Sequence, residues 1–497
     1  MTFSIVRCAV LLLSILAWTI PCCYAKESKP NIIYLLCDDL GIGDVQSFNP
    51  EHGKIKTPHI DRLASQGMKF TDAHSGSSVC TPTRYGLLTG RYSWRTKLQT
   101  GVVSGFGACL IDEDRPTIAS FLKSQGYQTG LVGKWHLNMR YIDSETKQEL
   151  TDGKSLKFTA PVGSTSPDGP IHRGFDYFFG IHHARSMKAV IEQDKVIEHD
   201  APINFLPRTV EKSVNFVKDA AAKEKPFFLY VPFGSPHTPI LPTPEWQGKS
   251  GLGKYADFVM QTDDGVGQIL KAVEDAGIAE NTLVIFTSDN GCSRQAKIGQ
   301  LAKKGHKVSA GYRGSKSDIW DGGHRVPFIA KWPGKVAAKS TCNQLICLND
   351  FFATIAEVLD QPVPAGSCED SISFLPALSG KQVETARKSL VHHSIHGHFA
   401  YRSENWKLVL ARGSGGWSGP TEKKVPADAP DAQLYDMKSD VAEQSNRFLD
   451  QQEVASRLLG ELEEAIHAGR TTPGPKSKND IDDIILWKSK ALNKSKG

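Results

Sequence analysis

The sequence predicts an α/β protein with a large, mixed but mostly parallel sheet sandwiched by helices, and a smaller C-terminal α+β domain built on an antiparallel sheet. Two observations support this fold class. Short continuous apolar runs recur between residue 30 and about residue 335, separated by amphipathic stretches, and this pattern is typical of parallel strands buried on both faces. From about residue 376 the runs become shorter and alternate with polar residues, which favours antiparallel strands.

The N-terminal residues have the pattern of a secretory signal peptide. Arg7 precedes an apolar run that ends at Trp18, and Cys23-Tyr24-Ala25 offers small residues for cleavage after residue 25. The run is short for a membrane span, so we expect a secreted or periplasmic protein with no stable membrane insertion after cleavage. The net charge of +5 is spread without long runs, and we expect no nucleic-acid partner.

The cysteine count is odd in the mature chain. The whole sequence has 10 cysteines, and removal of Cys8, Cys22 and Cys23 with the signal peptide leaves an odd number in an oxidising compartment. One cysteine is therefore available for another role, and Cys80 is the candidate. The other six could pair or stay buried: Cys37, Cys109, Cys292, Cys342, Cys347 and Cys368.

The first predicted strand, residues 31–37, ends in two adjacent carboxylates, Asp38 and Asp39. Open α/β sheets place their sites at the C-terminal ends of such strands. Adjacent acids at a partly buried position need a nearby cation. The alternative is a solvated turn in which the two aspartates cap a helix.

The segment at residues 78–84 places a cysteine, a proline and an arginine two residues apart from one another. Pro82 suits the first position of a helix, because its missing N–H is not needed there. We therefore expect Cys80 at a helix N-terminus, where free N–H groups and the helix dipole favour anions, with Arg84 close by. A buried structural cysteine is the alternative.

Two further apolar strands lead to basic residues. Residues 127–132 run into Lys134 and His136, which alternate in an extended segment and can point the same way. Residues 225–231 lead to His237, which lies between prolines and suits either a positioned acid or base or a rigid turn. Amphipathic helices are expected at residues 57–66, 117–125, 209–222, 255–276, 348–359 and 451–468.

The fourth apolar strand, residues 281–288, ends in Asp289 and Asn290, and the basic glycine-rich segment 313–327 then supplies Lys316. A phosphate-cradling loop is not favoured there, because Walker spacing is absent. Oxygen donors without clustered cysteines or histidines favour calcium or magnesium over zinc. Together with the cationic side chains, these residues predict a metal-containing anion site.

Other polar residues are assigned structural places. His182, His183 and Arg185 are interpreted as a surface loop rather than a pocket wall, and the aromatic segment 174–180 is expected to pack beneath the sheet. The C-terminal histidines lack a clear metal-binding partner, so strand and loop positions are favoured for His392, His393, His396 and His398. We expect a catalytic domain at residues 26–375, a small domain at 376–470 with strands near 390–393, 399–402, 406–410 and 433–436, and a loosely attached tail at 471–497.

Taken together, these motifs resemble those of the type I, formylglycine-dependent sulfatases of the alkaline phosphatase superfamily. The matching segments keep the family's order between about residue 30 and residue 335: Asp38-Asp39, Cys80-Thr81-Pro82-Thr83-Arg84 with Gly90-Arg91, Gly133-Lys134-Trp135-His136, Ser235-Pro236-His237, Ser288-Asp289-Asn290-Gly291, Gly314-Ser315-Lys316 and residues 322–327. The resemblance implies an alkaline-phosphatase-like fold. Thr81, Thr83 and Asp321 differ from the commonest family residues without affecting the chemistry.

The resemblance also implies a cofactor and roles for the site residues. A maturation enzyme would oxidise Cys80 to formylglycine, whose hydrate attacks sulfur and re-forms the aldehyde as sulfate leaves. One Ca²⁺ ion would be bound by Asp38, Asp39, the modified Cys80, Asp289 and Asn290. Arg84 and Lys134 would stabilise the diol, His136 would help to deprotonate it, and His237 with Lys316 would hold sulfate and protonate the leaving oxygen. Which of His136 and His237 is the principal acid stays open.

The expected function is therefore that of an arylsulfatase-like sulfuric ester hydrolase. Secretion favours a sulfated carbohydrate as substrate over other sulfate esters. One alternative is a phosphate or phosphonate monoester hydrolase, because the same metal and nucleophile can serve phosphoryl transfer. Another is a noncatalytic binder of sulfated glycans in which Cys80 stays unmodified.

Overall fold

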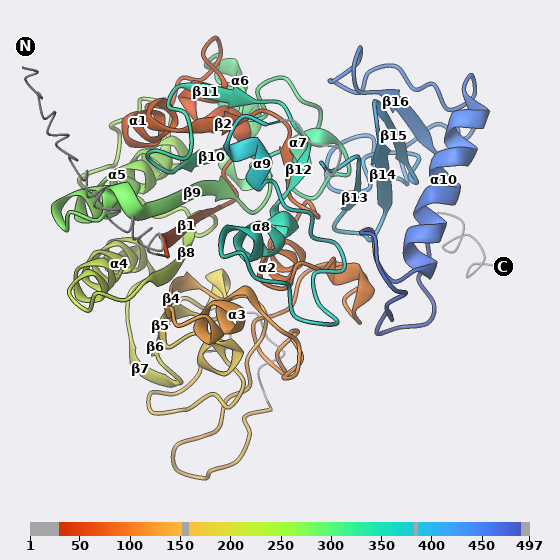
Figure 1. Cartoon of the computed structure of the whole chain (residues 1–497). Coiled ribbons are helices and arrows are strands. Elements are labelled where there is room, and N and C mark those ends of the chain that lie inside the picture. Colours follow the sequence, from red (N-terminus) through yellow and green to blue (C-terminus); the bar gives the residue numbers. More distant parts are fainter. Residues whose placement is uncertain (1–28, 152–158, 382–385, 489–497) are drawn as a thin grey trace, which may run out of the picture.

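The computed structural model describes residues 29–151, 159–381 and 386–488, so the predicted signal peptide lies outside the described residues. A ten-stranded sheet with helices on both faces forms the large domain, and a four-stranded sheet with one long helix forms the small domain (Figure 1). This arrangement confirms the predicted fold class. None of the helices in the described part has the length and apolarity needed to cross a membrane.

The large sheet is parallel at its centre, has antiparallel pairs on either side, and ends on one edge in a further parallel pair. In their order across the sheet, its strands are β11 (Ser340–Cys342), β2 (Met68–Phe70), β10 (Phe328–Lys331), β9 (Thr282–Ser288), β1 (Asn31–Asp38), β8 (Phe227–Pro236), β4 (Gln128–Lys134), β5 (Tyr177–Ile181), β6 (Ala189–Glu192) and β7 (Lys195–His199). Strands β9, β1, β8, β4 and β5 run parallel to their neighbours in this group. Strand β10 is antiparallel to β9 and β2, and β6 is antiparallel to β5 and β7.

The four apolar runs predicted as strands are β1, β4, β8 and β9, and they are neighbours in the sheet. Leu35 of β1 lies opposite Val231 of β8 on one side and Phe286 of β9 on the other. Because these strands are parallel and in this register, their C-terminal ends meet at one edge of the sheet. The polar residues that follow them are thereby brought together.

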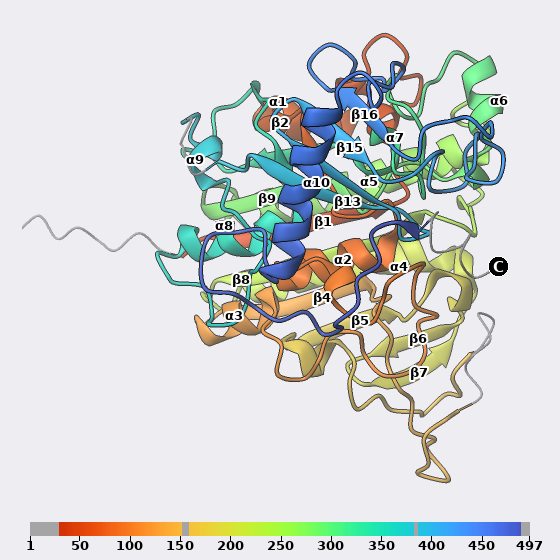
Figure 2. The same ribbon diagram turned by 90° about the vertical axis from the view of Figure 1, so that its right-hand side faces the viewer.

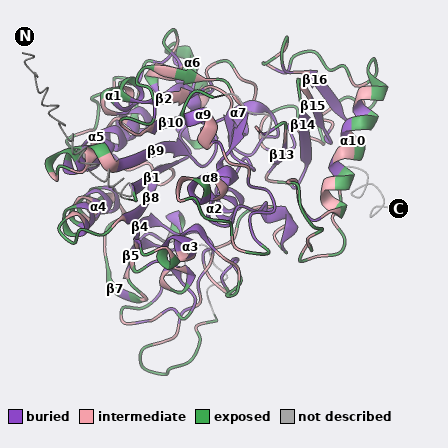
Figure 3. Cartoon of the chain, viewed as in Figure 1, coloured by how far each residue is buried: buried purple, intermediate pink, exposed green. Residues whose placement is uncertain are grey.

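Side chains of β1 alternate between two hydrophobic cores, as the pleat of a strand requires. Tyr34 and Leu36 belong to the core on one face, which includes residues of α2 (Cys80–Thr89), α3 (Ile118–Ser124) and α8 (Phe351–Val358). Ile33 and Leu35 belong to the core on the other face, beneath α1 (Pro58–Gln66), α4 (Phe205–Ala221) and α5 (Lys254–Asp275). Burial of each such large apolar side chain contributes about 1.5–3 kcal/mol. Buried residues accordingly concentrate in the sheet and on the facing sides of the helices (Figure 3).

Two local expectations are corrected. Helix α2 begins at Cys80 with Val79 as its N-cap, so Pro82 occupies the third helical position rather than the first. The backbone N–H at the third position would make no intrahelical hydrogen bond either, so proline is tolerated there. The aromatic segment expected beneath the sheet instead contains strand β5 of the sheet itself. Its Phe178 and Phe179 point into opposite cores, as successive residues of a strand do.

The small domain is an antiparallel sheet covered by one helix, as predicted (Figure 2). Its strands, in order, are β13 (Ser389–His393), β14 (Phe399–Ser403), β15 (Trp406–Val409) and β16 (Gln433–Asp436), and the helix is α10 (Gln452–His467). Leu458 and Leu462 of α10 pack with Leu408 and Tyr401 of the sheet. The remaining short elements are β3 (Ala73–His74), β12 (Ile346–Cys347), α6 (Ile298–Lys303), α7 (Asp321–His324) and α9 (Leu375–Leu378).

The segment after α10 is held in place as far as residue 488, which corrects the expectation of a loose tail. Arg91 Nη2 donates to Asp480 Oδ1 at 2.9 Å, and Arg95 Nη1 donates to Asn479 Oδ1 at 2.9 Å. Both guanidinium groups are buried and therefore require acceptors, which this segment supplies.

The seven cysteines in the described ranges form no disulfide with one another. All are buried except Cys342, which is partly exposed. Of the two alternatives left by the sequence, burial describes all of these residues except Cys342, and pairing describes none of them.

Candidate active site

The acidic residues that follow β1 and β9 form one buried cluster at the edge of the sheet. Asn290 Nδ2 donates to Asp39 Oδ1 at 2.8 Å, and the backbone N–H of Asp39 donates to Asp289 Oδ1 at 3.3 Å. Asp39 has φ of 67°, a left-handed conformation that aspartate tolerates better than most residues. The structure thus brings Asp38, Asp39, Asp289 and Asn290 together, as the sequence predicted.

Three oxygens in this cluster are buried without a hydrogen-bond partner: Asp38 Oδ1, Asp39 Oδ2 and Asn290 Oδ1. An unsatisfied buried acceptor costs about 1–3 kcal/mol, and more when the group is charged. Ligand atoms of Asp38, Asp289 and Cys80 lie within 4.8 Å of one another. Carboxylate and amide oxygens are the ligands that hard divalent cations prefer, so the residues present fit such an ion.

Cys80 is buried at the first position of α2. Burial raises the pKa of its thiol, although the Lys134 and Lys316 ammonium groups oppose the shift. Because the thiolate is the reactive form of cysteine, an unmodified Cys80 is a poor nucleophile at neutral pH.

Three cationic side chains contact the carboxylates. Arg84 donates through Nε and Nη2 to Asp289 Oδ2 at 3.2 and 2.9 Å. Lys134 forms an ion pair with Asp38, and Lys316 forms one with Asp39. Burial would raise the pKa of the Asp38 carboxyl, but the charges of Lys134, His237, Arg84 and Lys316 together hold that pKa well below its usual range. The aspartate therefore stays ionised.

The two predicted histidines both line the cavity next to this cluster and differ in their contacts. His136 has φ of 56°, its Nε2–H donates to the carbonyl of Val103 at 3.1 Å, and its Nδ1 is buried without a partner. Burial lowers its pKa well below the usual value, so the ring is neutral and Nδ1 carries a lone pair. His237 follows β8 and places Nε2 3.6 Å from Asp39 Oδ2. Burial lowers the pKa of His237 to about 4, although Asp39 opposes the shift.

A cavity of about 270 Å³ opens above Cys80 and is lined by His136, His237 and Lys316 among others. Its walls also include residues that the sequence analysis placed elsewhere or did not single out: His183, Arg185, Gln295, Ile395 and Trp417. The surface-loop interpretation of His183 is wrong, because its side chain is buried with its ring centroid 4.3 Å from that of His136.

A signal for His183 was present in the sequence. Residues 182–185 follow an apolar strand, in the same way as the other site clusters do. No comparable signal marks Trp417 or Ile395, because they come from the small domain.

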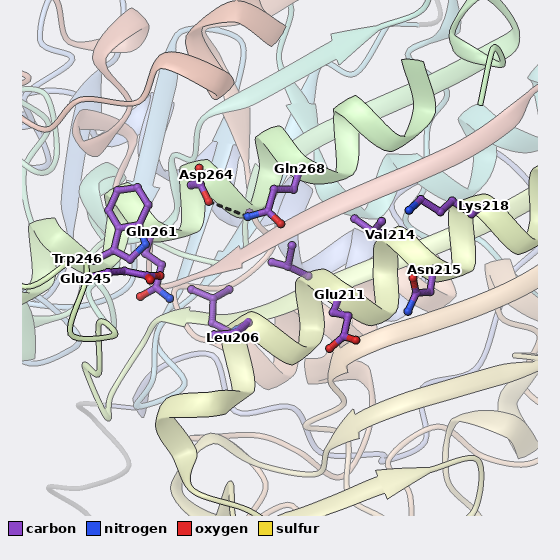
Figure 4. A pocket seen from close by; sticks show the side chains of 13 residues that line it. Leu206, Glu211, Val214, Asn215, Lys218, Glu245, Trp246, Gln261, Asp264 and Gln268 are labelled. Atoms are coloured by element: carbon purple, nitrogen blue, oxygen red, sulfur yellow. Dashed lines mark hydrogen bonds between the residues drawn. The ribbon is translucent and has the colours of Figure 1, made fainter. Parts of the chain in front are cut away.

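A second hollow, of about 360 Å³, lies between α4 and α5 and is lined by Trp246, Glu211 and Asp264 among others (Figure 4). Asp264 accepts a hydrogen bond from Gln268 at 2.8 Å. Its neighbour Asp263 accepts backbone N–H groups at the start of α1. Neither aspartate belongs to the acidic cluster.

Comparisons with known proteins agree with this geometry. Residues 30–361 match the family model described as sulfatase. The chain is 33% identical over 490 residues to the N-acetylgalactosamine-6-O-sulfatase of Bacteroides thetaiotaomicron, covering 89% of this chain and 94% of that protein. It is 30% identical over 505 residues to arylsulfatase A of Bos taurus, covering 93% of each.

A solved structure points the same way. The description of that structure refers to the metabolism of multiple glycosaminoglycans by Bacteroides thetaiotaomicron. The match has a TM-score of 0.77 and 30% identity, and it covers 88% of this chain and 99% of that chain. The family model, these relatives and the fold agree with one another, and the chain belongs to the sulfatase family of sulfuric ester hydrolases.

Proposed function

We propose that this protein is a secreted or periplasmic sulfatase that removes sulfate from a carbohydrate, using one calcium ion and a formylglycine derived from Cys80. The observation that carries the proposal is the group of three unpartnered oxygens, on Asp38, Asp39 and Asn290, next to a buried Cys80 beneath a cavity. The relative named N-acetylgalactosamine-6-O-sulfatase makes 6-sulfated N-acetylgalactosamine the first substrate to test.

The calcium ion would be held by Asp38, Asp39, Asp289, Asn290 and the modified Cys80. Calcium supplies positive charge that stabilises the developing anion and makes a bound hydroxyl easier to deprotonate. The unpartnered oxygens support this assignment, because they have no donor among the described residues and a cation would satisfy them.

The aldehyde at position 80 would be made by a formylglycine-generating maturation enzyme, which is the protein partner we propose. Formylglycine supplies a hydrated aldehyde as the nucleophile and lets sulfate be released when the aldehyde re-forms. Burial raises the pKa of the Cys80 thiol, which supports a need for this modification. Arg84 and Lys134 place positive charge beside the same residue and would stabilise its oxygens.

The remaining residues would bind sulfate and move protons. Neutral His136, with its unpartnered Nδ1, is suited to accept a proton from the residue at position 80. Lys316 and His237 line the same cavity and would hold the sulfate oxygens and protonate the leaving alcohol. Electrostatic stabilisation by such fixed charges is usually the largest contribution to catalysis.

The test combines mass analysis with turnover. Protein co-expressed with a formylglycine-generating enzyme should give a peptide at position 80 with the mass of the aldehyde, and it should release sulfate from 6-sulfated N-acetylgalactosamine. Cys80→Ala, prepared in the same way, should be inactive.

Two outcomes would contradict the proposal. A strong preference for nitrophenyl phosphate over nitrophenyl sulfate would favour a phosphate or phosphonate monoester hydrolase. Binding of sulfated glycans by protein with unmodified Cys80, without turnover after maturation, would favour a noncatalytic binder.

A further inference from the structure

An aromatic side chain of the small domain reaches the cavity above Cys80. Trp417 lies in the glycine-rich segment between β15 and β16, is half-buried, and lines the cavity together with Ile395. The guanidinium carbon of Arg294 lies 4.7 Å from the centroid of its ring. A cation stacked on one face holds the indole in place and leaves the opposite face for another contact.

Asp318 ties the backbone of this segment to the turn that carries Lys316. Its Oδ1 accepts the backbone N–H groups of Trp417 at 2.9 Å and of Ser418 at 3.0 Å. Its Oδ2 accepts the backbone N–H of Ser315 at 2.9 Å. One carboxylate therefore fixes the spacing between the indole and the Lys316 ammonium.

The two segments also approach each other closely. A Cβ atom added to Gly416 would lie 2.4 Å from the carbonyl oxygen of Ser317, so a side chain at this position would separate them. The backbone N–H of Trp417 also donates to Ser317 Oγ at 3.0 Å. The position of the ring therefore depends on the Lys316 turn rather than on the small domain alone.

We propose that Trp417 is the residue that recognises the sugar, by stacking on the pyranose ring whose sulfate lies against Lys316, and that Asp318 is the positioning residue that sets the distance between the two. This inference rests on the proposed carbohydrate substrate. The C–H face of a pyranose is apolar and matches the face of an indole. A cavity of about 270 Å³ lies below the range of about 300–1,000 Å³ usual for drug-sized ligands, so it suits a single sulfated sugar unit.

The experiment separates sugar recognition from sulfate binding. Trp417→Ala should lower kcat/KM for 6-sulfated N-acetylgalactosamine by about tenfold or more, mainly through a higher KM. The inhibition constant of inorganic sulfate should stay unchanged, and Trp417→Phe should retain most of the kcat/KM.

Trp246→Ala is the matched control. Trp246 is also half-buried, with the Lys249 ammonium 4.3 Å from its ring centroid, but it lines the separate hollow between α4 and α5. Its substitution should change neither constant.

Asp318→Asn tests the positioning role. An amide cannot accept hydrogen bonds on both sides, so the KM for the sugar and the inhibition constant of sulfate should both rise, with folding checked by thermal unfolding. An active enzyme in which Trp417→Ala leaves the KM unchanged, or weakens sulfate inhibition as much as sugar binding, would overturn the inference alone. Matured wild-type protein without turnover of any sulfate ester would overturn the proposed function and this inference together.

Discussion

Two buried polar clusters in this molecule look alike in composition and differ in how their atoms are paired. The active-site cluster contains Asp38, Asp289 and Cys80, and a second cluster contains His74, His324 and His392 where the small domain meets the large one. We call the second group the interface cluster. Both sets bring three candidate ligand residues within 4.8 Å of one another.

The interface cluster is largely satisfied by its own hydrogen bonds. Lys407 Nζ donates to Asp321 Oδ1 and Glu443 Oε1 at 2.8 Å and lies 3.2 Å from His324 Nε2. His324 Nδ1 lies 3.0 Å from His74 Nδ1. His324 Nε2 also lies 3.1 Å from the carbonyl oxygen of Ile319, and His74 Nε2 donates to Asp72 Oδ1 at 2.8 Å. The ring nitrogens of His74 and His324 therefore have partners within the protein and need no external ligand.

The active-site cluster is not closed in this way. Three of its oxygens are unpartnered, and Cys80 lines a cavity. In the interface cluster the unpartnered atoms are the two ring nitrogens of His392, which is fully buried and stacked on His324 with ring centroids 3.6 Å apart. Unpaired oxygen ligands beside a cavity indicate a site for a cation and a substrate. A network of paired opposite charges indicates a structural contact between domains.

The largest effect should follow from substitution in the active-site cluster. Asp289→Ala removes a proposed calcium ligand and the acceptor of Arg84, so turnover should fall by about a thousandfold or more. The far-UV circular dichroism should be unchanged. Asp264→Ala, an aspartate outside both clusters, is the control and should keep full turnover. Retained activity in Asp289→Ala would contradict the role of this cluster.

The opposite result should follow from substitution in the interface cluster. Lys407→Met leaves the buried Glu443 carboxylate without its cation and Asp321 with Arg325 alone, so the free energy of unfolding should fall by about 3–5 kcal/mol. The kcat/KM per folded molecule should stay near that of the wild type. Lys271→Met, which breaks an exposed pair with Asp275, should cost less than about 0.5 kcal/mol in the same denaturant titration. A large loss of kcat/KM in Lys407→Met without a loss of stability would contradict a structural role for the interface cluster.

The sequence predicted that the residues of the active-site cluster lie together, and it did not predict the interface cluster. Asp38, Lys134, His237 and Asp289 each follow an apolar strand, so a parallel sheet is enough to bring them together. His392 was correctly expected on a strand, but the residues that contact it are far away in the chain, and no local sequence pattern predicts these contacts.

The same reason explains why the walls of the cavity were missed. Trp417 reaches the site through hydrogen bonds to Asp318, a contact between residues separated by 99 positions. It also lies in an irregular segment, where neither a helical nor a strand period operates. Residues that depend on packing between domains are therefore recognised only when the fold is known.

Removal of the proposed calcium ion should distinguish the clusters again, with a smaller effect on stability than Lys407→Met. A ligand that binds only the folded state stabilises it by about 2.7 kcal/mol at a concentration one hundred times its Kd. A calcium chelator should therefore lower the melting temperature of the wild type and abolish its turnover. It should leave the melting temperature of Asp289→Ala unchanged.

Added Zn²⁺ should not raise the melting temperature of the wild type, because His74 and His324 of the interface cluster already have hydrogen-bond partners. A clear rise would show that this cluster binds metal.

The smallest expected effect concerns a buried carboxyl that has no ion pair with any of the described residues. Asp263 accepts the backbone N–H groups of Ile60 at 2.8 Å and His59 at 3.2 Å, and burial raises its pKa from 3.8 to about 7. Because the folded state holds this proton more tightly than the unfolded chain, the stabilising contribution is complete below about pH 4 and is lost as the pH rises towards 7. Asp263→Asn should remove that loss, so its stability should decline less than the wild type's, by about 1–2 kcal/mol, between about pH 5 and 7. Asp264→Asn, at the next residue of the same helix, is the control and should show the same dependence of stability on pH as the wild type in thermal unfolding. If Asp263→Asn also showed the wild-type dependence, the Asp263 carboxyl would be ionised in the folded protein across this range.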